Sequence, residues 1–169
     1  MRKMVDRLRR LGGRKRPRRT LSHGELITRL INEPRTGFGR PAVFVETGSG
    51  VSTVALARAA GEIGGTVYSC DYNDEKVDSL KQAAGSDLGS IRFLIGDSLD
   101  SLRKIASEHD RLDFVFLDSA ASAMHTFREF MLVEPCLKPG AVLLIDNAAL
   151  PDEKSVLSPV RKGKILVNY

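Results

Sequence analysis

Glycine-rich and acidic segments follow directly after short apolar runs at several points of the chain. In the first of them, residues 46–52, Gly48 and Gly50 stand one residue apart behind the apolar residues 42–45. Glycine lets the backbone turn sharply and approach a ligand closely because it has no Cβ. A helix that begins near Ser52 would also point free N–H groups at that ligand. The loop alone is weak evidence, because a tight strand-to-helix turn that binds no ligand also explains it.

Acidic residues end the next two apolar runs. Asp71 lies 21 residues beyond Gly50, where a carboxylate can accept hydrogen bonds from both hydroxyls of a ribose. The neighbouring Tyr72 offers a ring for an adenine face. Asp97, followed by Ser98, can accept a hydrogen bond from the adenine amino group. Taken alone, Asp71 is as well explained as a helix cap or a solvated acid, but with the glycine loop it indicates an adenosine-type ligand.

The residues around the glycines discriminate among adenosine ligands. A dinucleotide-binding loop requires a third glycine where this chain has Thr53, and the Gly-Lys-Ser/Thr of a phosphate-binding loop is absent. Glu46 would repel a pyrophosphate but suits the cationic amino group of a methionine moiety. The pattern therefore favours S-adenosylmethionine (SAM) over NAD or ATP.

Apolar runs of strand length alternate with amphipathic runs of helix length. The expected strands are Ala42–Glu46, Thr66–Cys70, Ile91–Ile95, Leu112–Leu117 and Ala141–Ile145. The expected helices between them are Ser52–Ala60, Asp74–Ala84, Leu99–His109 and His125–Leu137. Such alternation predicts right-handed crossovers and a doubly wound, mainly parallel α/β sheet with helices on both faces. Its ligand site should lie at the carboxyl ends of the strands.

The ends of the chain add two expected elements. Ser22 and Glu25 have capping-box spacing, and an apolar stripe follows until Pro34, which predicts a helix packed over the start of the fold. Lys164–Tyr169 reads as a strand. We therefore expect six strands, or seven if the usual last strand is present.

Residues 43–50, Val-Phe-Val-Glu-Thr-Gly-Ser-Gly, resemble motif I of the class I SAM-dependent methyltransferases, and Asp71 and Asp97 fall where that family has its ribose and adenine acids. The resemblance covers roughly residues 40–148 and implies a Rossmann-like fold. Ser52 stands where many members have a third glycine. The resemblance implies that SAM is bound by Glu46, Thr47, Gly48, Ser49, Gly50, Ser52, Asp71, Tyr72, Asp97, Ser98 and Asp118.

Asp118 after the fourth expected strand and Asp146-Asn147 after the fifth resemble the metal-dependent O-methyltransferases of catechol and caffeoyl-CoA type. The resemblance implies that Asp118, Asp146 and Asn147 bind a divalent cation, usually Mg²⁺, which orients the hydroxyls of the acceptor. Ala121 occupies the position where relatives carry a lysine or histidine base, and His125 is the candidate replacement. Alternatively, His125 only opens a helix, and Asp118 lies near the SAM sulfonium without a metal.

The charge of the chain is unevenly distributed. Residues 1–19 hold ten basic residues and one acid, whereas the other 150 residues hold 16 basic and 20 acidic residues. We expect residues 1–20 to form a flexible basic arm and residues 21–169 to form the SAM-binding domain. The arm is a solvated tail, a contact for nucleic acid or an anionic surface, or an organelle-targeting presequence, which the scarcity of serine disfavours.

The composition is that of an ordinary globular protein, with 42% hydrophobic residues and no apolar run long enough to span a membrane. Cys70 and Cys136 lie in apolar segments and are expected to be buried reduced thiols of a cytoplasmic protein.

Taken together, these features predict a SAM-dependent methyltransferase that acts on a hydroxyl of a small molecule. The alternatives are a methyltransferase on RNA or protein docked by the basic arm, a SAM-binding module without catalysis and, last, a nicotinamide oxidoreductase. The Asn/Asp-Pro-Pro-aromatic motif of amino-group methylating enzymes is absent, which disfavours the first alternative.

Overall fold

The computed structural model describes residues 22–32, 38, 40–120 and 122–146. In these residues five strands form one sheet: β1 (Val43–Thr47), β2 (Thr66–Asp71), β3 (Ile91–Ile95), β4 (Leu112–Leu117) and β5 (Leu137–Ile145). The helices are α2 (His23–Ile31), α3 (Val51–Ile63), α4 (Asp74–Ala84), α5 (Ser98–Glu108) and α6 (Ala123–Val133), with short 3-10 helices η1 (Gly85–Ser90) and η2 (Glu134–Cys136). The basic segment 1–20, Ala121, Asn147 and the expected strand Lys164–Tyr169 lie outside the described residues.

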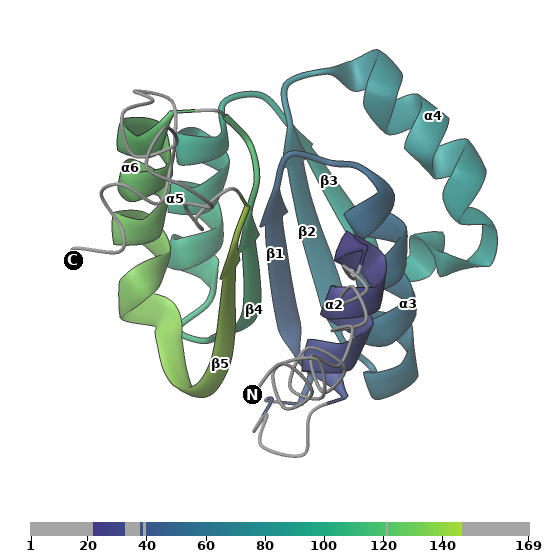
Figure 1. Ribbon diagram of the computed structural model, residues 1–169, viewed down its shortest axis with the longest axis horizontal. Coiled ribbons are helices and arrows are strands. Elements are labelled where there is room, and N and C mark those ends of the chain that lie inside the picture. The colour runs from purple at the N-terminus through teal and green to yellow at the C-terminus, as the bar shows by residue number, and fades with distance from the viewer. Residues whose placement is uncertain (1–21, 33–37, 39, 121, 147–169) are drawn as a thin grey trace, which may run out of the picture.

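The five strands are parallel and follow the order β3-β2-β1-β4-β5 (Figure 1). The chain builds outward from β1 to β3 and then returns to place β4 on the other side of β1. Thr47 is in register with Cys70 of β2 and with Leu117 of β4, so three strands end at one level. This reversal of strand order creates the crevice in which doubly wound sheets bind ligands.

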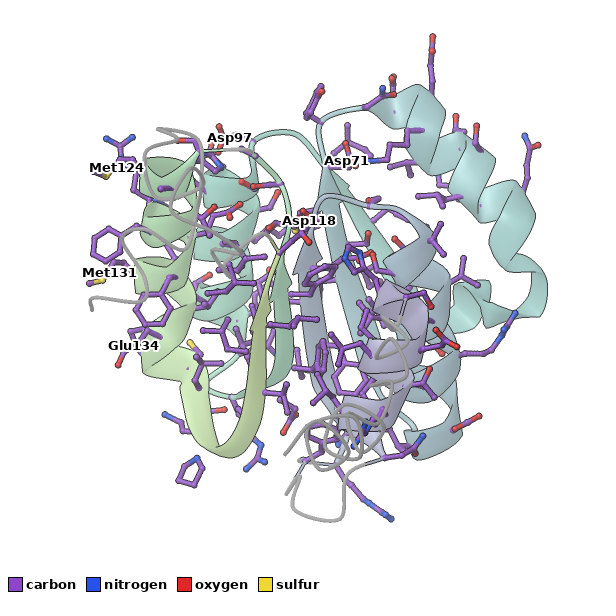
Figure 2. All side chains as sticks on the ribbon, viewed as in Figure 1. Asp71, Asp97, Asp118, Met124, Met131 and Glu134 are labelled. Carbon is purple, nitrogen blue, oxygen red and sulfur yellow. The ribbon has the colours of Figure 1, made fainter. Side chains whose placement is uncertain are left out.

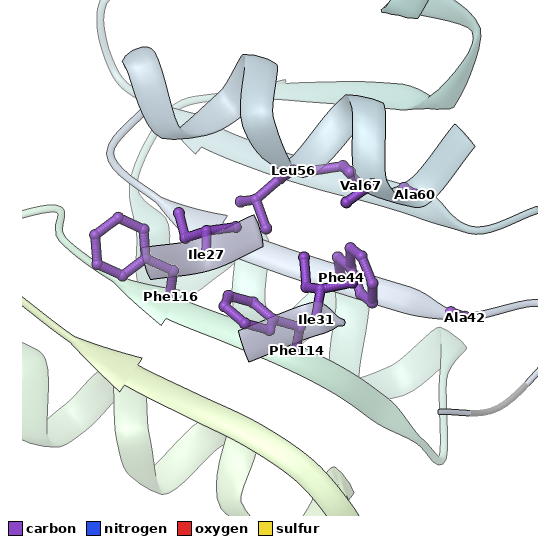
Figure 3. Close-up of a cluster of buried hydrophobic side chains, with 10 residues drawn as sticks. Ile27, Ile31, Ala42, Phe44, Leu56, Ala60, Val67, Phe114 and Phe116 are labelled. Carbon is purple, nitrogen blue, oxygen red and sulfur yellow. The ribbon is translucent and has the colours of Figure 1, made fainter. Parts of the chain in front are cut away.

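Helices cover both faces of the sheet, as predicted: α2 and α3 on one face, and α5 and α6 on the other (Figure 1). Successive strand residues point to opposite faces, so Phe44 packs under α2 and α3 while Val45 faces α5. Figure 3 shows the first cluster, in which Ile27 and Ile31 of α2 lie against Phe114 and Phe116 of β4. The two helical layers therefore pack on opposite faces of the sheet and hold the strand ends in place.

Helix α2 starts as its sequence predicts. Ser22 N donates to Glu25 Oε2 at 2.9 Å, and Glu25 N donates to Ser22 Oγ at 3.3 Å, which completes the capping box. The first residue of the helix, His23, reaches the edge of the Phe116 ring, with ring centroids 5.6 Å apart. The cap and the apolar stripe thus place His23 above the end of β4.

Two predicted boundaries are wrong by four residues, whereas the other predicted boundaries of the strands and of helices α3 to α6 agree within three residues. The helix expected over His125–Leu137 ends at Val133, because Pro135 lacks an N–H and is incompatible with a continued α-helix. Strand β5 begins at Leu137 rather than Ala141, and its pairing with β4 shifts register between Leu112 and Phe114, opposite the segment with Pro139 and Gly140. Proline cannot donate to the ladder, so the regular pairing resumes only at Val142.

The five strands expected within the described residues are all present in the sheet, and the sixth, Lys164–Tyr169, lies outside those residues. None of the helices in the described ranges combines the length and apolar character needed to cross a bilayer.

Candidate functional site

A cavity of about 400 Å³ lies at the carboxyl ends of the strands, where the predicted motifs meet. Figure 2 shows Asp71, Asp97 and Asp118 at this end of the sheet, at the tips of three different strands. The volume falls within the range of small-molecule sites. The lining residues are Gly48, Ser49, Cys70, Asp71, Tyr72, Asn73, Lys76, Gly96, Asp97, Ser98, Asp118, Ser119, Ala120 and His125.

The turn after β1 requires glycine at position 48. Gly48 has a φ of +86°, and a Cβ built there would lie 2.3 Å from the main-chain oxygen of Asp118. No side chain fits such a contact. The missing Cβ therefore allows the loops after β1 and β4 to touch, which closes the floor of the cavity.

Asp71 anchors the loop and faces the cavity. Its Oδ2 accepts from Ser49 N at 2.8 Å and from Lys76 Nζ at 2.8 Å, and its Oδ1 accepts from Asn73 N at 3.0 Å. Burial alone would raise the pKa of the Asp71 carboxyl, but the hydrogen bonds and the charge of Lys76 outweigh it and lower that pKa. Asp71 is therefore a carboxylate at neutral pH.

Glu46 lies beneath the loop rather than in the cavity. Its side chain is fully buried and accepts from Ser52 Oγ at 2.8 Å and Ser69 Oγ at 2.7 Å. Ser69 Oγ also lies 2.8 Å from Ser49 Oγ, which links Glu46 to the glycine turn. Burial raises the pKa of Glu46 to about 7, although the surrounding hydroxyls oppose this rise. Glu46 thus supports the loop through these hydrogen bonds, and its carboxyl group gains or loses a proton near neutral pH.

The other wall of the cavity carries a hydrogen-bonded group centred on His125. The Nε2 atom of His125 lies 2.9 Å from Ser98 Oγ and 3.4 Å from Oε1 of Glu129, one turn later on α6. Glu129 is fully buried, and its Oε1 accepts from Ser119 Oγ at 2.5 Å. Its Oε2 has no hydrogen-bond partner among the residues that the structure describes. Glu129 therefore contacts the imidazole of His125 from the buried side of α6 and positions it.

Asp97 and Cys70 both line the cavity, but their side chains differ in exposure and in chemical character. Asp97 is exposed and caps α5, with Oδ1 accepting from Leu99 N at 2.7 Å. The Cys70 thiol is buried, and burial raises its pKa to about 12, which leaves it a neutral, inert surface. Cys70 and Cys136 are both buried free thiols, as the sequence predicts.

Asp118 and Asp146, the predicted metal ligands at the ends of β4 and β5, come together beside the cavity. His23 of α2 joins them: one ligand atom from each of the three residues lies within 4.8 Å of the other two. Two carboxylate oxygens and an imidazole nitrogen are a donor set that fits a divalent cation.

The structure thus divides the predicted site residues into three groups. Those that line the cavity are Gly48, Ser49, Asp71, Tyr72, Asp97, Ser98, Asp118 and His125. Those beneath or beside the loop are Glu46, Thr47, Gly50 and Ser52, of which Thr47 receives a hydrogen bond from Asp118 N at 2.9 Å. Asp146 lies in the cluster with His23, and Asn147 lies outside the described residues.

Sequence analysis missed His23, Lys76 and Glu129. The only local signal was the spacing of His125 and Glu129, which places two side chains four apart on one helix face. His23 approaches acids that are distant in the sequence, and no short-range pattern marks such contacts. Lys76 lies only five residues after Asp71, but a strand-to-helix turn separates the two residues.

A family profile described as "Methyltransferase domain" matches residues 45–148, well over half of the chain. The chain belongs to this methyltransferase family. The matched region of the methyltransferase domain runs from the middle of β1 to just beyond β5, and so contains the residues that line the strand-end cavity.

Solved structures share the fold of this methyltransferase domain. The cofactor-bound protein Rv0187 from MTB is 22% identical with a TM-score of 0.61, over 100% of this chain and 79% of that chain. The O-methyltransferase TomG from Streptomyces achromogenes, in complex with SAM, is 23% identical with a TM-score of 0.61, over 89% of this chain and 70% of that one. A third structure is the MycE methyltransferase of the mycinamycin biosynthetic pathway, in complex with Mg and S-adenosylhomocysteine (SAH). It is 18% identical with a TM-score of 0.57, over 85% of this chain and 42% of that chain. Among the curated proteins, none matches the chain.

Proposed function

We propose that this methyltransferase domain binds SAM in the strand-end cavity and transfers its methyl group to a hydroxyl of a small molecule. The observation that carries the proposal is the contact between the glycine turn and Asp71, whose Oδ2 accepts from Ser49 N at 2.8 Å. The carboxylate that we assign to the ribose is therefore hydrogen-bonded to the loop whose glycines would let a ligand approach the backbone. TomG in complex with SAM and MycE in complex with SAH, on the same fold, support this choice of cofactor.

Each part of SAM has a proposed partner in the lining. Asp71 binds the ribose hydroxyls, and Tyr72, which is 81% exposed at the mouth of the cavity, packs on the adenine. Asp97 and Ser98 bind the polar edge of the adenine from the start of α5. The turn at residues 48–50 holds the methionine moiety. Three predicted SAM-binding residues do not line the cavity: Glu46, Thr47 and Ser52. We assign to them the role of holding this turn in place from below.

The proposed chemistry is an in-line displacement. The acceptor oxygen forms a bond to the SAM methyl carbon as the bond from that carbon to sulfur breaks, and the acceptor proton passes to a base. We assign the base to the imidazole of His125, which belongs to the cavity lining. Glu129 is a positioning residue that stabilises the imidazolium once the proton has transferred. Since the methyl group is already activated, the protein mainly aligns the reactants and excludes water.

We further propose that Asp118 and Asp146, together with Asn147, hold a divalent cation at the acceptor side of the cavity. Such a cation stabilises the acceptor oxygen as an anion and lowers its pKa. Asp118 lies in both the cavity lining and the cluster with His23 and Asp146, and this supports a cation site that would adjoin the SAM cavity.

Titration calorimetry tests the choice of cofactor. We expect SAM and SAH to bind and NAD not to bind. The D71A variant should lose about 1–3 kcal/mol of SAH binding energy, the range for lost hydrogen bonds to a charged acceptor. Asp74, exposed in the first turn of α4, provides the matched control D74A, which should bind SAH as the wild type does. Equal SAH affinity in folded D71A would remove Asp71 from the site.

Methyl transfer from labelled SAM to a panel of catechols, with EDTA or with added Mg²⁺ or Mn²⁺, tests the reaction. Transfer that EDTA abolishes and the cations restore supports the metal. Transfer that EDTA leaves unchanged would indicate a metal-free methyltransferase. SAM binding without transfer to any hydroxyl acceptor would instead favour a binding module.

A further inference from the structure

His23 lies at the first position of α2, on the acceptor side of the strand ends, and it faces two acids from other elements. Its Nε2 is 3.2 Å from Oδ1 of Asp146, which follows β5. Asp118, which follows β4, completes a group whose ligand atoms all lie within 4.8 Å of one another. Three elements that are separate in the sequence thus direct one nitrogen and two oxygen donors to a common point.

The main chain holds each of these residues in place. Asp118 N donates to Thr47 O at 2.9 Å, and Asp146 N donates to Leu117 O at 3.1 Å, so both acids continue the hydrogen bonding of the sheet. His23 is fixed by the capping box of α2 and by its edge contact with Phe116. The donor positions are therefore set by the fold, and only side-chain torsions remain to be adjusted.

The size of the group suits one metal ion. Donor atoms bound at about 2.0–2.2 Å from a transition metal lie at most about 4.4 Å apart. Three donors spaced evenly around one ion at this distance lie about 3.5–3.8 Å apart, so a group whose donors lie within 4.8 Å must contract by at most about 1 Å to bind it. Two carboxylates also match the charge of a divalent cation.

The imidazole changes which cation the site prefers. Mg²⁺ prefers oxygen donors and keeps most of its water, whereas an imidazole nitrogen suits Zn²⁺, Co²⁺ and other first-row transition metals. We propose that His23, Asp118 and Asp146 form a nitrogen-containing site for a divalent transition metal, with His23 as a direct ligand. This inference deepens the metal part of the proposed function, since it names a ligand from α2 and the class of cation.

The chain contains three histidines, so a spectroscopic test can examine each one. Full-length protein is loaded with Mn²⁺, and pulsed EPR detects the ¹⁴N coupling of a bound imidazole. We expect this coupling in the wild type, in H109Q and in H125Q, and its loss in H23Q. His109 contacts Tyr68 OH at 2.8 Å and is absent from the metal cluster, which makes H109Q the matched control.

Calorimetry with Mn²⁺, Co²⁺ and Mg²⁺ gives the second readout. H23Q should weaken Mn²⁺ and Co²⁺ binding by roughly tenfold or more, with a smaller effect on Mg²⁺. His23 is 53% exposed and lies outside the cavity lining, so H23Q should fold normally and keep its SAH affinity.

Two results would overturn the inference. One is ¹⁴N coupling that persists in H23Q, and the other is Mn²⁺ binding that D118N abolishes but H23Q leaves unchanged, which would mean a site of oxygen ligands alone. Neither result affects SAH binding. Failure of SAH to bind the wild-type protein would contradict the proposed function separately.

Discussion

The ammonium group of Lys76 lies 2.8 Å from Oδ2 of Asp71, on the carboxylate that we assign to the ribose of SAM. That carboxylate also accepts two main-chain hydrogen bonds, from Ser49 and Asn73. A carboxylate has about four acceptor positions, so three are occupied before the two ribose hydroxyls bind. Lys76 is the partner that can leave, because its side chain is long and 45% exposed.

We therefore expect K76M to strengthen SAH binding by about two- to fivefold, the effect of removing a partly exposed ion pair that competes with the ligand. SAM should gain slightly more than SAH because its sulfonium is repelled by the same ammonium group. Calorimetry at low salt measures both affinities. K81M is the control, since Lys81 of the same helix pairs with the exposed Asp78. Weaker binding by K76M would show that Lys76 contacts the ligand itself.

Glu46 should make the stability of the domain depend on pH. The unfolded chain releases this proton near the ordinary value of 4.5 and the folded protein near about 7. Between these values the folded state holds the extra proton, so the free energy of unfolding should fall as pH rises from 4.5 to 7 and level off above.

The loss is at most about 3.5 kcal/mol, from about 1.4 kcal/mol per pKa unit. Urea unfolding of E46Q should show a smaller decrease over this range. E62Q, on the exposed side of α3, should keep the wild-type profile. Parallel profiles for the wild type and E46Q would show that Glu46 does not titrate in this range.

His125 should contribute to turnover and not to cofactor binding. H125Q removes the proton acceptor, and loss of a general base typically lowers kcat by about 10²–10⁴-fold. E129Q keeps the shape of the buried side chain but removes the charge that stabilises the imidazolium, so we expect a smaller fall in kcat. Labelled-SAM transfer assays give kcat, and calorimetry should give unchanged SAH affinity for both variants. A loss of SAH affinity equal to the loss of kcat would make His125 a cofactor ligand.

Gly48 should be intolerant of any side chain. In G48A the left-handed backbone costs roughly 1–2 kcal/mol, and the Cβ must also avoid the Asp118 oxygen 2.3 Å away. We expect a total loss above about 2 kcal/mol together with loss of SAH binding. Gly64 has a φ of +70°, and a Cβ built there would have nothing within 4 Å. G64A therefore measures the free-energy cost of the left-handed backbone without a steric contact. Similar losses in both variants would mean that the loop after β4 moves away without cost.

The charge of segment 1–19, which holds ten basic residues, predicts that this segment binds nucleic acid and does not contribute to SAH binding. Deleting residues 1–19 should leave SAH affinity unchanged and abolish any salt-sensitive binding to RNA or DNA. Fluorescence anisotropy at several salt concentrations measures this binding. Full-length protein that binds no nucleic acid even at low salt would exclude a docking role for the segment.

Sequence alone was sufficient to predict the five described strands and the loops that carry chemistry, because apolar periodicity and glycine spacing report local structure. Ser22 and Glu25 formed the expected capping box for the same reason: both partners belong to one helical turn. The carboxyl-end placement of Asp71, Asp97 and Asp118 followed from the single rule that parallel strands end at one edge. The end of α6 at Val133 is also a local effect, because Pro135 ends the α-helix although the apolar pattern continues to Leu137.

The tertiary structure decided which of those residues meet and which way they face. Glu46 stands in the sequence next to the glycine turn, yet the pleat of β1 directs its carboxylate into the interior, away from the cavity. Lys76 reaches Asp71 because α4 folds back over the end of β2. His23 meets Asp118 and Asp146 only because the strand order places β4 and β5 under the start of α2. Contacts between distant segments depend on how the elements pack, and no pattern within a single segment carries that information.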